Sequence, residues 1–244
     1  MKRFVLFLDD GGVISDNNVR GPQWQRLVSE FFPPVLGGEP QAWADANRTV
    51  INAILEPAAW EARLKAAPDY RTFEDEYYIY WLGEMCRLVG VPQPPDEESI
   101  ALSRQVSTWI TRQVRADFPG VVDTIRLLHE RGYVLHTASG ESSTDLEAYL
   151  GTMGVLGCFG NLYGPDLIDT FKVGPQFYER MFDHASVSPD GALVVDDSPL
   201  AVSWVSQVGA HTVLVGAQTT MQVPRLLGTI GSLSELPGLI EELE

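Results

Sequence analysis

The feature that most constrains the fold is an apolar run at residues 4–8 that ends abruptly in Asp9, Asp10, Gly11 and Gly12. An uninterrupted apolar run of this kind is typical of a strand that is buried on both faces, as in a parallel sheet covered by helices. Open α/β sheets bind their ligands outside the carboxyl ends of the strands. The two carboxylates therefore stand where such a sheet would place a site.

A second apolar run, at residues 192–195, ends in the same way, in Asp196 and Asp197. One Asp pair alone is more often a helix cap or a turn, because the Asp side chain bonds readily to nearby backbone N–H groups. Two pairs in the same context instead indicate one clustered acidic site, of the kind that holds a hard divalent cation.

From residue 120 onward, strand and helix patterns alternate along the chain. The predicted strands are 133–136, 192–195 and 211–215, and the predicted helices are 121–131, 144–150, 175–184 and 201–208. Such alternation predicts an α/β fold with a doubly wound parallel sheet that is covered by helices on both faces.

The segment between the first strand and this region differs, because it shows helical patches, proline and glycine separators and no convincing strand. The predicted helices are 24–32, 41–55, 58–66, 73–89 and 97–115. We therefore expect an all-helical domain at residues 19–115, inserted into a core domain that comprises residues 1–18 and 116–244.

Composition excludes several classes of partner. The formal charge of −16 argues against nucleic acid or an anionic membrane surface. No run reaches the ~18 apolar residues of a membrane span, and the N-terminal apolar run is too short for a signal peptide. Cys86 and Cys158 are far apart in the sequence and are expected to be reduced residues of a cytoplasmic protein.

Further polar groups follow the predicted strands. Thr137, Ala138 and Ser139 follow the second strand and lead into a helix, whose backbone N–H groups can bind an anion. Lys172, one of three lysines in the chain, precedes a helix that begins near Pro175. Carboxylates, one cation, a hydroxyl and free N–H groups at one sheet edge suit phosphoryl transfer.

The order of these motifs resembles the four motifs of the haloacid dehalogenase-like (HAD) hydrolases. The matching segments are Asp-Asp-Gly-Gly-Val, Leu-His-Thr, Lys172 before Phe177-Tyr178, and Val-Val-Asp-Asp-Ser. The helical insert is similar to the cap of the phosphoglycolate-phosphatase and phosphoglucomutase branch of that superfamily.

The resemblance implies specific roles. Asp9 matches the nucleophile, and Thr137 matches the hydroxyl that holds the phosphoryl oxygens. Lys172 matches the lysine that pairs with the nucleophile and with the phosphoryl group. It also implies a Mg²⁺ site in which Asp197 is a direct ligand, with Asp196 an additional or water-mediated one. Asp9 and the backbone carbonyl of Gly11 complete the implied set of ligands.

The sequence departs from the family pattern at Gly11, which occupies the position of the second Asp of the first motif. That Asp donates a proton to the leaving group, a contribution commonly worth about 10²- to 10⁴-fold in rate. Three explanations are open. The substrate has a good leaving group, such as an acyl or aryl phosphate; Asp10 takes over the proton transfer; or the reaction is dehalogenation or carbon–phosphorus cleavage. A binding protein that has lost turnover is a further alternative.

The expected function is therefore a Mg²⁺-dependent HAD-type hydrolase, a phosphatase that acts on a small phosphorylated compound. Candidate substrate-binding residues lie at the strand ends and at the entry to the helical insert; they are Asp10, Ala138, Ser139, Asn17 and Arg20. The forked guanidinium of Arg20 suits an anionic group, although a structural ion pair accounts for it equally well.

Overall fold

The computed structural model describes residues 3–216 and 218–243. The chain folds into two compact units. One joins the segment up to Asn17 to the segment from Arg115 onward, and the other spans Asn18–Val114. The boundaries predicted from the sequence lie within one residue of these.

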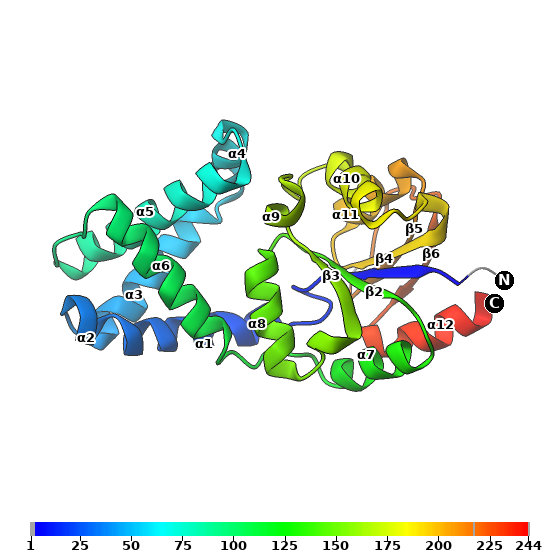
Figure 1. The fold of residues 1–244 in the computed structure, drawn as a ribbon, viewed down its shortest axis with the longest axis horizontal. Helices are drawn as coiled ribbons and strands as arrows, with labels where there is room; N and C mark the ends of the chain where they lie inside the picture. The colour runs from blue at the N-terminus through cyan, green and yellow to red at the C-terminus, as the bar shows by residue number, and fades with distance from the viewer. Residues whose placement is uncertain (1–2, 217, 244) are drawn as a thin grey trace. The chain divides into compact units, whose positions relative to one another are not determined.

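The first unit is built on a six-stranded parallel sheet with the strand order β3-β2-β1-β4-β5-β6 (Figure 1). The strands are β1 (Val5–Leu8), β2 (Leu135–Ala138), β3 (Phe159–Tyr163), β4 (Ala192–Asp196), β5 (His211–Val215) and β6 (Leu226–Ile230). The strand order reverses at β1, between β2 and β4, and this is the point at which doubly wound sheets bind ligands. The predicted α/β doubly wound fold is confirmed.

Helices cover both faces of this sheet, α10 and α11 on one side and α7 and α12 on the other (Figure 1). The helices of the unit are α7 (Val121–Glu130), α8 (Ser143–Met153), α9 (Pro165–Ile168), α10 (Pro175–Ala185), α11 (Pro199–Val208) and α12 (Leu236–Leu243), with single 3₁₀ turns at Leu156–Cys158, Pro189–Gly191 and Leu233–Glu235. Leu6, Phe7 and Leu8 are all fully buried, although successive side chains point to opposite faces. This explains why β1 is apolar without alternation.

The central core under α10 and α11 is aromatic. Phe7 of β1 packs edge-on against Phe182 of α10, with ring centroids 5.2 Å apart, and Val194 of β4 and Val205 of α11 belong to the same buried cluster. This packing fixes α10, and with it the loop before Pro175, against the sheet.

Three strand predictions need correction. Strand β2 begins at Leu135, not at residue 133, because Gly132 and Tyr133 still close the preceding helix: the Tyr133 amide donates to the Leu128 carbonyl at 3.1 Å. The strands β3 and β6 were not predicted, since Phe159–Tyr163 and Leu226–Ile230 each contain a glycine and lack a continuous apolar run.

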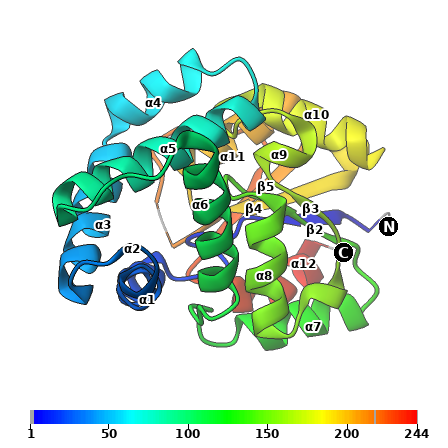
Figure 2. The same ribbon diagram turned by 60° about the vertical axis from the view of Figure 1, so that its left-hand side comes forward.

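The second unit contains helices alone among its regular elements, as predicted. They are α1 (Asn17–Phe31, its first residue belonging to the first unit), α2 (Pro33–Leu36), α3 (Pro40–Ile54), α4 (Pro57–Ala66), α5 (Tyr70–Val89) and α6 (Asp96–Thr111) (Figure 2). Phe32 stacks on Trp43 with centroids 4.6 Å apart, and the Trp81 indole donates to Asn47 at 3.0 Å. Trp43 and Trp81 are therefore packing residues of the helical unit.

Across residues 3–216 and 218–243, every helix falls short of the length and apolar character that crossing a bilayer requires.

Candidate active site

The sheet register brings the predicted site residues to one edge. In β1, Leu8 pairs with Thr137 of β2 on one side and with Val195 of β4 on the other. The Asp9 amide then donates to the Val195 carbonyl at 2.9 Å, which extends the ladder by one residue. Asp9 therefore emerges at the carboxyl end of the sheet between the last residues of its two neighbouring strands.

A buried lysine joins the two acidic strand ends. Lys172, in the loop between α9 and α10, places its ammonium 2.9 Å from Asp9 Oδ1 and 2.8 Å from Asp196 Oδ2. The side chains of Lys172 and Asp9 are each 11% exposed, and that of Asp196 is fully buried. These three residues come from segments far apart in the chain and form one ion-paired cluster.

Burial and charge set the protonation of this cluster. Burial alone would lower the pKa of Lys172, but the carboxylates of Asp196 and Asp9 hold that pKa well above its ordinary value. The pKa of Asp9 is raised to about 7, because burial and, to a smaller extent, the Asp196 carboxylate outweigh the lowering effect of Lys172. The lysine is thus a fixed cation, and the Asp9 carboxylate is costly to ionise without added positive charge.

Asp197 completes an acidic group with Asp9 and Asp196, in which one oxygen of each lies within 4.8 Å of the others. Burial raises the pKa of Asp197, and the Asp196 carboxylate adds to this. Hard divalent cations such as Mg²⁺ prefer carboxylate oxygens at this kind of spacing. The donor set and its surplus of negative charge fit such an ion.

Gly12 makes room for the Asp197 carboxylate. Its φ of +83° lies in the left-handed region, and a Cβ added there would meet Asp197 Oδ2 at 2.0 Å. Gly11 is part of the same turn and forms an isolated bridge with Ser15. The absence of a side chain at Gly12 therefore lets this turn lie against the Asp197 carboxylate.

Asp10 is not one of the three carboxylates of this acidic group. It is fully buried, and its Oδ1 accepts a hydrogen bond from the Ser15 hydroxyl at 2.8 Å. Its carbonyl accepts from the amides of Ile14 and Ser15, both at 2.8 Å. Consecutive side chains on an extended backbone point in opposite directions. The Asp10 side chain therefore bonds within the loop, whereas the Asp9 side chain points to the acidic group.

The end of β2 lies beside Asp9. Thr137 and Ala138 are fully buried, and the Thr137 hydroxyl donates to the Tyr163 carbonyl at 3.2 Å. The Ser139 amide donates to the same carbonyl at 2.9 Å, and the Ser139 hydroxyl accepts from the Glu141 amide at 3.1 Å. This segment is held rigidly by β3 as it leads toward α8.

The two predicted residues at the insert entry are placed differently. Asn17 is exposed at the start of α1 in the first unit, whereas Arg20 is buried within α1 in the second unit. Tyr178 of α10 was not predicted as a site residue. Burial, with the Asp196 and Asp9 carboxylates, raises the pKa of this tyrosine well above its ordinary value. Tyr178 lies in α10, the helix that follows the Lys172 loop. The sequence did not single it out, because an aromatic residue in a helical pattern usually indicates core packing.

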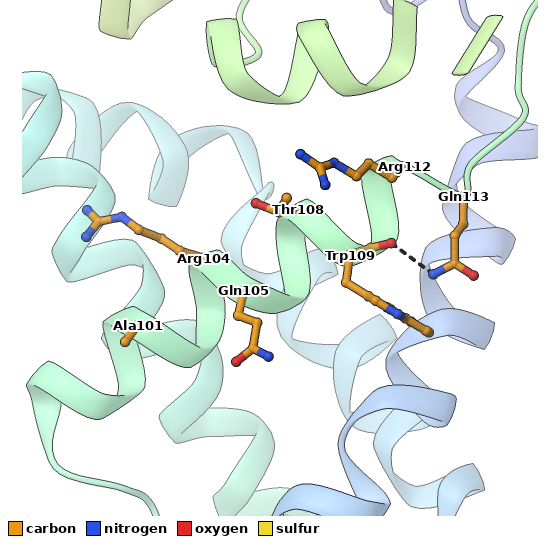
Figure 3. A pocket seen from close by; sticks show the side chains of 7 residues that line it. All are labelled: Ala101, Arg104, Gln105, Thr108, Trp109, Arg112 and Gln113. Carbon is orange, nitrogen blue, oxygen red and sulfur yellow. Dashed lines mark hydrogen bonds between the residues drawn. The ribbon is translucent and has the colours of Figure 1, made fainter. Parts of the chain in front are cut away.

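A separate hollow of about 570 Å³ lies on one face of α6, between Ala101 and Gln113. Figure 3 shows that Arg104 and Trp109 project from α6 and that Arg112 projects from the turn directly after it. Arg104 is bound to Glu74 and Asp75 of α5. None of the predicted catalytic residues Asp9, Thr137 and Lys172 lines the hollow.

Comparisons with known proteins identify the family and the fold. Residues 7–200 match the family model of the haloacid dehalogenase-like hydrolases. No curated protein sequence matches the chain significantly.

Solved structures share the whole fold at low sequence identity. L-2-haloacid dehalogenase from Xanthobacter autotrophicus is 13% identical with a TM-score of 0.63, covering 99% of this chain and 100% of its own. A predicted phosphoglycolate phosphatase from Haemophilus somnus 129PT is 13% identical with a TM-score of 0.62, covering 98% and 99%. The HAD-hydrolase YfnB from Bacillus subtilis, in its magnesium-bound form, is 16% identical with a TM-score of 0.66, covering 98% and 99%. At these identities the likeness concerns the fold, while the family match rests on the sequence. The chain is a hydrolase that belongs to the haloacid dehalogenase-like family.

Proposed function

We propose that this hydrolase is a Mg²⁺-dependent phosphatase that acts on a small phosphorylated compound, with Asp9 as its nucleophile. The observation that carries the proposal is the position of the Lys172 ammonium, 2.9 Å from Asp9 and 2.8 Å from Asp196, beside a third carboxylate, Asp197. A nucleophilic carboxylate, a fixed cation and a set of acidic metal ligands are the components that phosphoryl transfer needs.

In the first step an oxygen of Asp9 attacks phosphorus, and the bond between phosphorus and the leaving oxygen breaks. The leaving group departs with the electron pair of that bond. Lys172 and the Asp10 amide, the latter at 2.8 Å, both bind Oδ1 of Asp9. This arrangement orients the other oxygen, Oδ2, for the attack. The Thr137 hydroxyl, after rotating away from the Tyr163 carbonyl to which it now donates, would bind an equatorial phosphoryl oxygen.

In the second step water attacks the phosphorus of the aspartyl-phosphate, and the bond from phosphorus to Asp9 breaks. The water oxygen becomes the fourth oxygen of inorganic phosphate, one of its protons leaves to solvent, and the Asp9 carboxylate is restored. Lys172 stays protonated in both steps because its pKa lies well above the neutral range.

The cofactor of the proposal is Mg²⁺, held by Asp9, Asp196, Asp197 and the Gly11 carbonyl. When bound, it neutralises negative charge shared by the carboxylates and the phosphoryl oxygens. The three carboxylates face one ammonium in a buried setting, so the cluster carries a surplus of negative charge that a divalent cation balances. The magnesium bound by YfnB, which shares the fold, supports this assignment.

Dehalogenation of a haloacid is the alternative that the structural neighbours raise. Such a substrate carries its own carboxylate, which the surplus negative charge of Asp9, Asp196 and Asp197 would repel. A phosphoryl group accompanied by a cation fits the same cluster better. The formal charge of −16 favours a small-molecule substrate over nucleic acid, and the free Cys86 and Cys158 fit a reducing compartment such as the cytoplasm.

The proposal is tested by measuring phosphate release from a panel of phosphomonoesters and acyl phosphates, with Mg²⁺ or with EDTA, in parallel with halide release from 2-chloropropionate. We expect Mg²⁺-dependent phosphate release that Asp9→Asn abolishes, and no halide. Halide release in EDTA, or phosphate release that persists in Asp9→Asn, would overturn the proposal.

A further inference from the structure

The space beside Gly11 is filled by another residue of the same unit, and this bears on the substrate class. We infer that the Asn17 carboxamide stands in the place of the missing proton donor and restricts the site to leaving groups that depart without a proton, namely acyl and aryl phosphates. This inference rests on the proposed phosphatase function and narrows it.

The geometry at Gly11 is specific. A Cβ added to Gly11 would lie 2.9 Å from Asn17 Nδ2, 3.3 Å from Oδ1 and 3.5 Å from Cγ. The carboxamide of Asn17 therefore lies directly next to the position that the first side-chain atom at residue 11 would take. Asn17 is exposed at the start of α1, so its amide is accessible to a ligand.

The other polar groups near Asp9 are unsuited to protonate a leaving group. The Asp10 carboxylate is buried and accepts from Ser15 in the loop. The Lys172 ammonium is bound between the carboxylates of Asp9 and Asp196, and the Tyr178 side chain is fully buried in the core under α10.

A carboxamide donates a hydrogen bond but cannot transfer its proton at neutral pH. The leaving oxygen must then depart as an anion that is stable in water. Carboxylates and phenolates meet this condition, whereas the alkoxide of a sugar or polyol phosphate does not. The Asn17 N–H would stabilise the charge that develops on the leaving oxygen.

The test is a leaving-group series run with Mg²⁺: acetyl phosphate, aryl phosphates from nitrophenyl to phenyl, and glycerol phosphate. We expect kcat/KM of the wild type to fall steeply as the leaving-group pKa rises. Asn17→Ala should lower kcat/KM for aryl phosphates by about tenfold, the value of one lost hydrogen bond in the transition state. The neighbouring exposed residue supplies the matched control, and Asn18→Ala should leave kcat/KM unchanged.

A second comparison restores an acid. Gly11→Asp alone places its side chain against Asn17, whereas Gly11→Asp combined with Asn17→Ala clears the space. The double variant should raise turnover of glycerol phosphate relative to nitrophenyl phosphate by about tenfold or more, the low end of general acid catalysis or above, and Gly11→Asp alone should do so less. Thermal unfolding of each variant shows whether it is folded.

The outcomes separate the two claims. Mg²⁺-dependent phosphate release with a flat leaving-group dependence, or an Asn17→Ala variant that behaves like Asn18→Ala, would overturn the role of Asn17 and leave the phosphatase intact. A folded double variant without the shift toward glycerol phosphate would overturn it as well. No phosphate release from any compound would overturn the proposed function and this inference together.

Discussion

The ammonium of Lys172 lies 2.9 Å from the Asp9 carboxylate, although the two residues are separated by most of the chain. The contact depends on the fold of the first unit: β1 delivers Asp9, and the packing of α10 on the sheet holds the loop that carries Lys172. A change to this ion pair should therefore affect both the stability of the first unit and the proposed reaction.

Replacing Lys172 with Met should damage stability and activity together. The substitution keeps most of the side-chain volume but leaves the buried Asp9 and Asp196 without a counter-charge, which typically costs about 3–5 kcal/mol. Urea unfolding with EDTA measures this loss. Lys65→Met is the matched control, because the ion pair between Lys65 and Glu61 is 74% and 66% exposed and should contribute little to stability. Equal effects of the two substitutions would show that the buried ion pair contributes no more to the free energy of unfolding than the exposed pair does.

Replacing Gly12 with Ala should weaken Mg²⁺ binding. The new Cβ would lie 2.0 Å from Asp197 Oδ2, so the carboxylate must move away. We expect the Mg²⁺ concentration for half-maximal activity to rise by at least about tenfold. This is the size of effect seen when a residue that orients a metal ligand is lost. Gly209→Ala, whose φ is +91° and whose added Cβ has nothing within 4 Å, carries the same backbone strain without the clash. A Mg²⁺ requirement that changes equally in both variants would contradict the assignment of Asp197.

Replacing Asp9 with Asn should stabilise the metal-free protein above pH 7 while abolishing turnover. Burial raises the pKa of Asp9 from 3.8 to about 7, so between these pH values the folded protein holds a proton that the unfolded chain releases. The contribution of Asp9 to stability therefore falls as the pH rises through this window, and the full cost of its charge is present above it. We expect a gain on the order of 1 kcal/mol in Asp9→Asn, or roughly 2–4 °C in Tm.

Thermal unfolding at pH 8 with EDTA measures this gain, and it should vanish near pH 4. Added Mg²⁺ should reverse the order by stabilising the wild type more. A lower Tm for Asp9→Asn at pH 8 in EDTA would mean that the attraction to Lys172 outweighs the burial of the charge.

Replacing Thr137 with Val should slow phosphate release with little effect on the fold. The Thr137 hydroxyl donates to the Tyr163 carbonyl at 3.2 Å, but that carbonyl still accepts from the Ser139 amide. The stability cost should thus stay near 1 kcal/mol, whereas loss of a donor to the phosphoryl group should lower kcat by about 10²-fold. Thr137→Ser retains the hydroxyl and should keep most of the rate. If Val and Ser reduce kcat equally, the hydroxyl has no part in the reaction.

The sequence predicted the architecture and most of the cluster for one physical reason. Parallel strands end at a common edge, so apolar runs that stop at Asp9 and at Asp196 bring these carboxylates together whatever lies between them. Lys172 was found through its place in the order of motifs. Its contact with both carboxylates depends on the packing of α10, which no local pattern encodes.

The features that the sequence did not predict depend on contacts between segments. Strand β3 carries Gly160, and a Cβ there would meet His136 Cε1 at 2.8 Å, so this glycine serves packing between strands and hides the strand pattern. The contact between Asn17 and Gly11 depends on the turn at Ser15, so the sequence alone could not predict it either. Local sequence patterns predicted where the strands end. The strand register and the turns determine which side chains come into contact, and local patterns do not encode these.

The proposed mechanism requires that Asp9 becomes phosphorylated during turnover. This can be measured by mixing the protein with acetyl phosphate and Mg²⁺, quenching in acid within the first turnover, reducing with borohydride and identifying the modified residue by peptide mass spectrometry. Borohydride converts an aspartyl-phosphate to homoserine, so we expect homoserine at position 9, and only when substrate is present. Phosphate release with Asp9 unmodified, or with the modification on another residue, would contradict the mechanism.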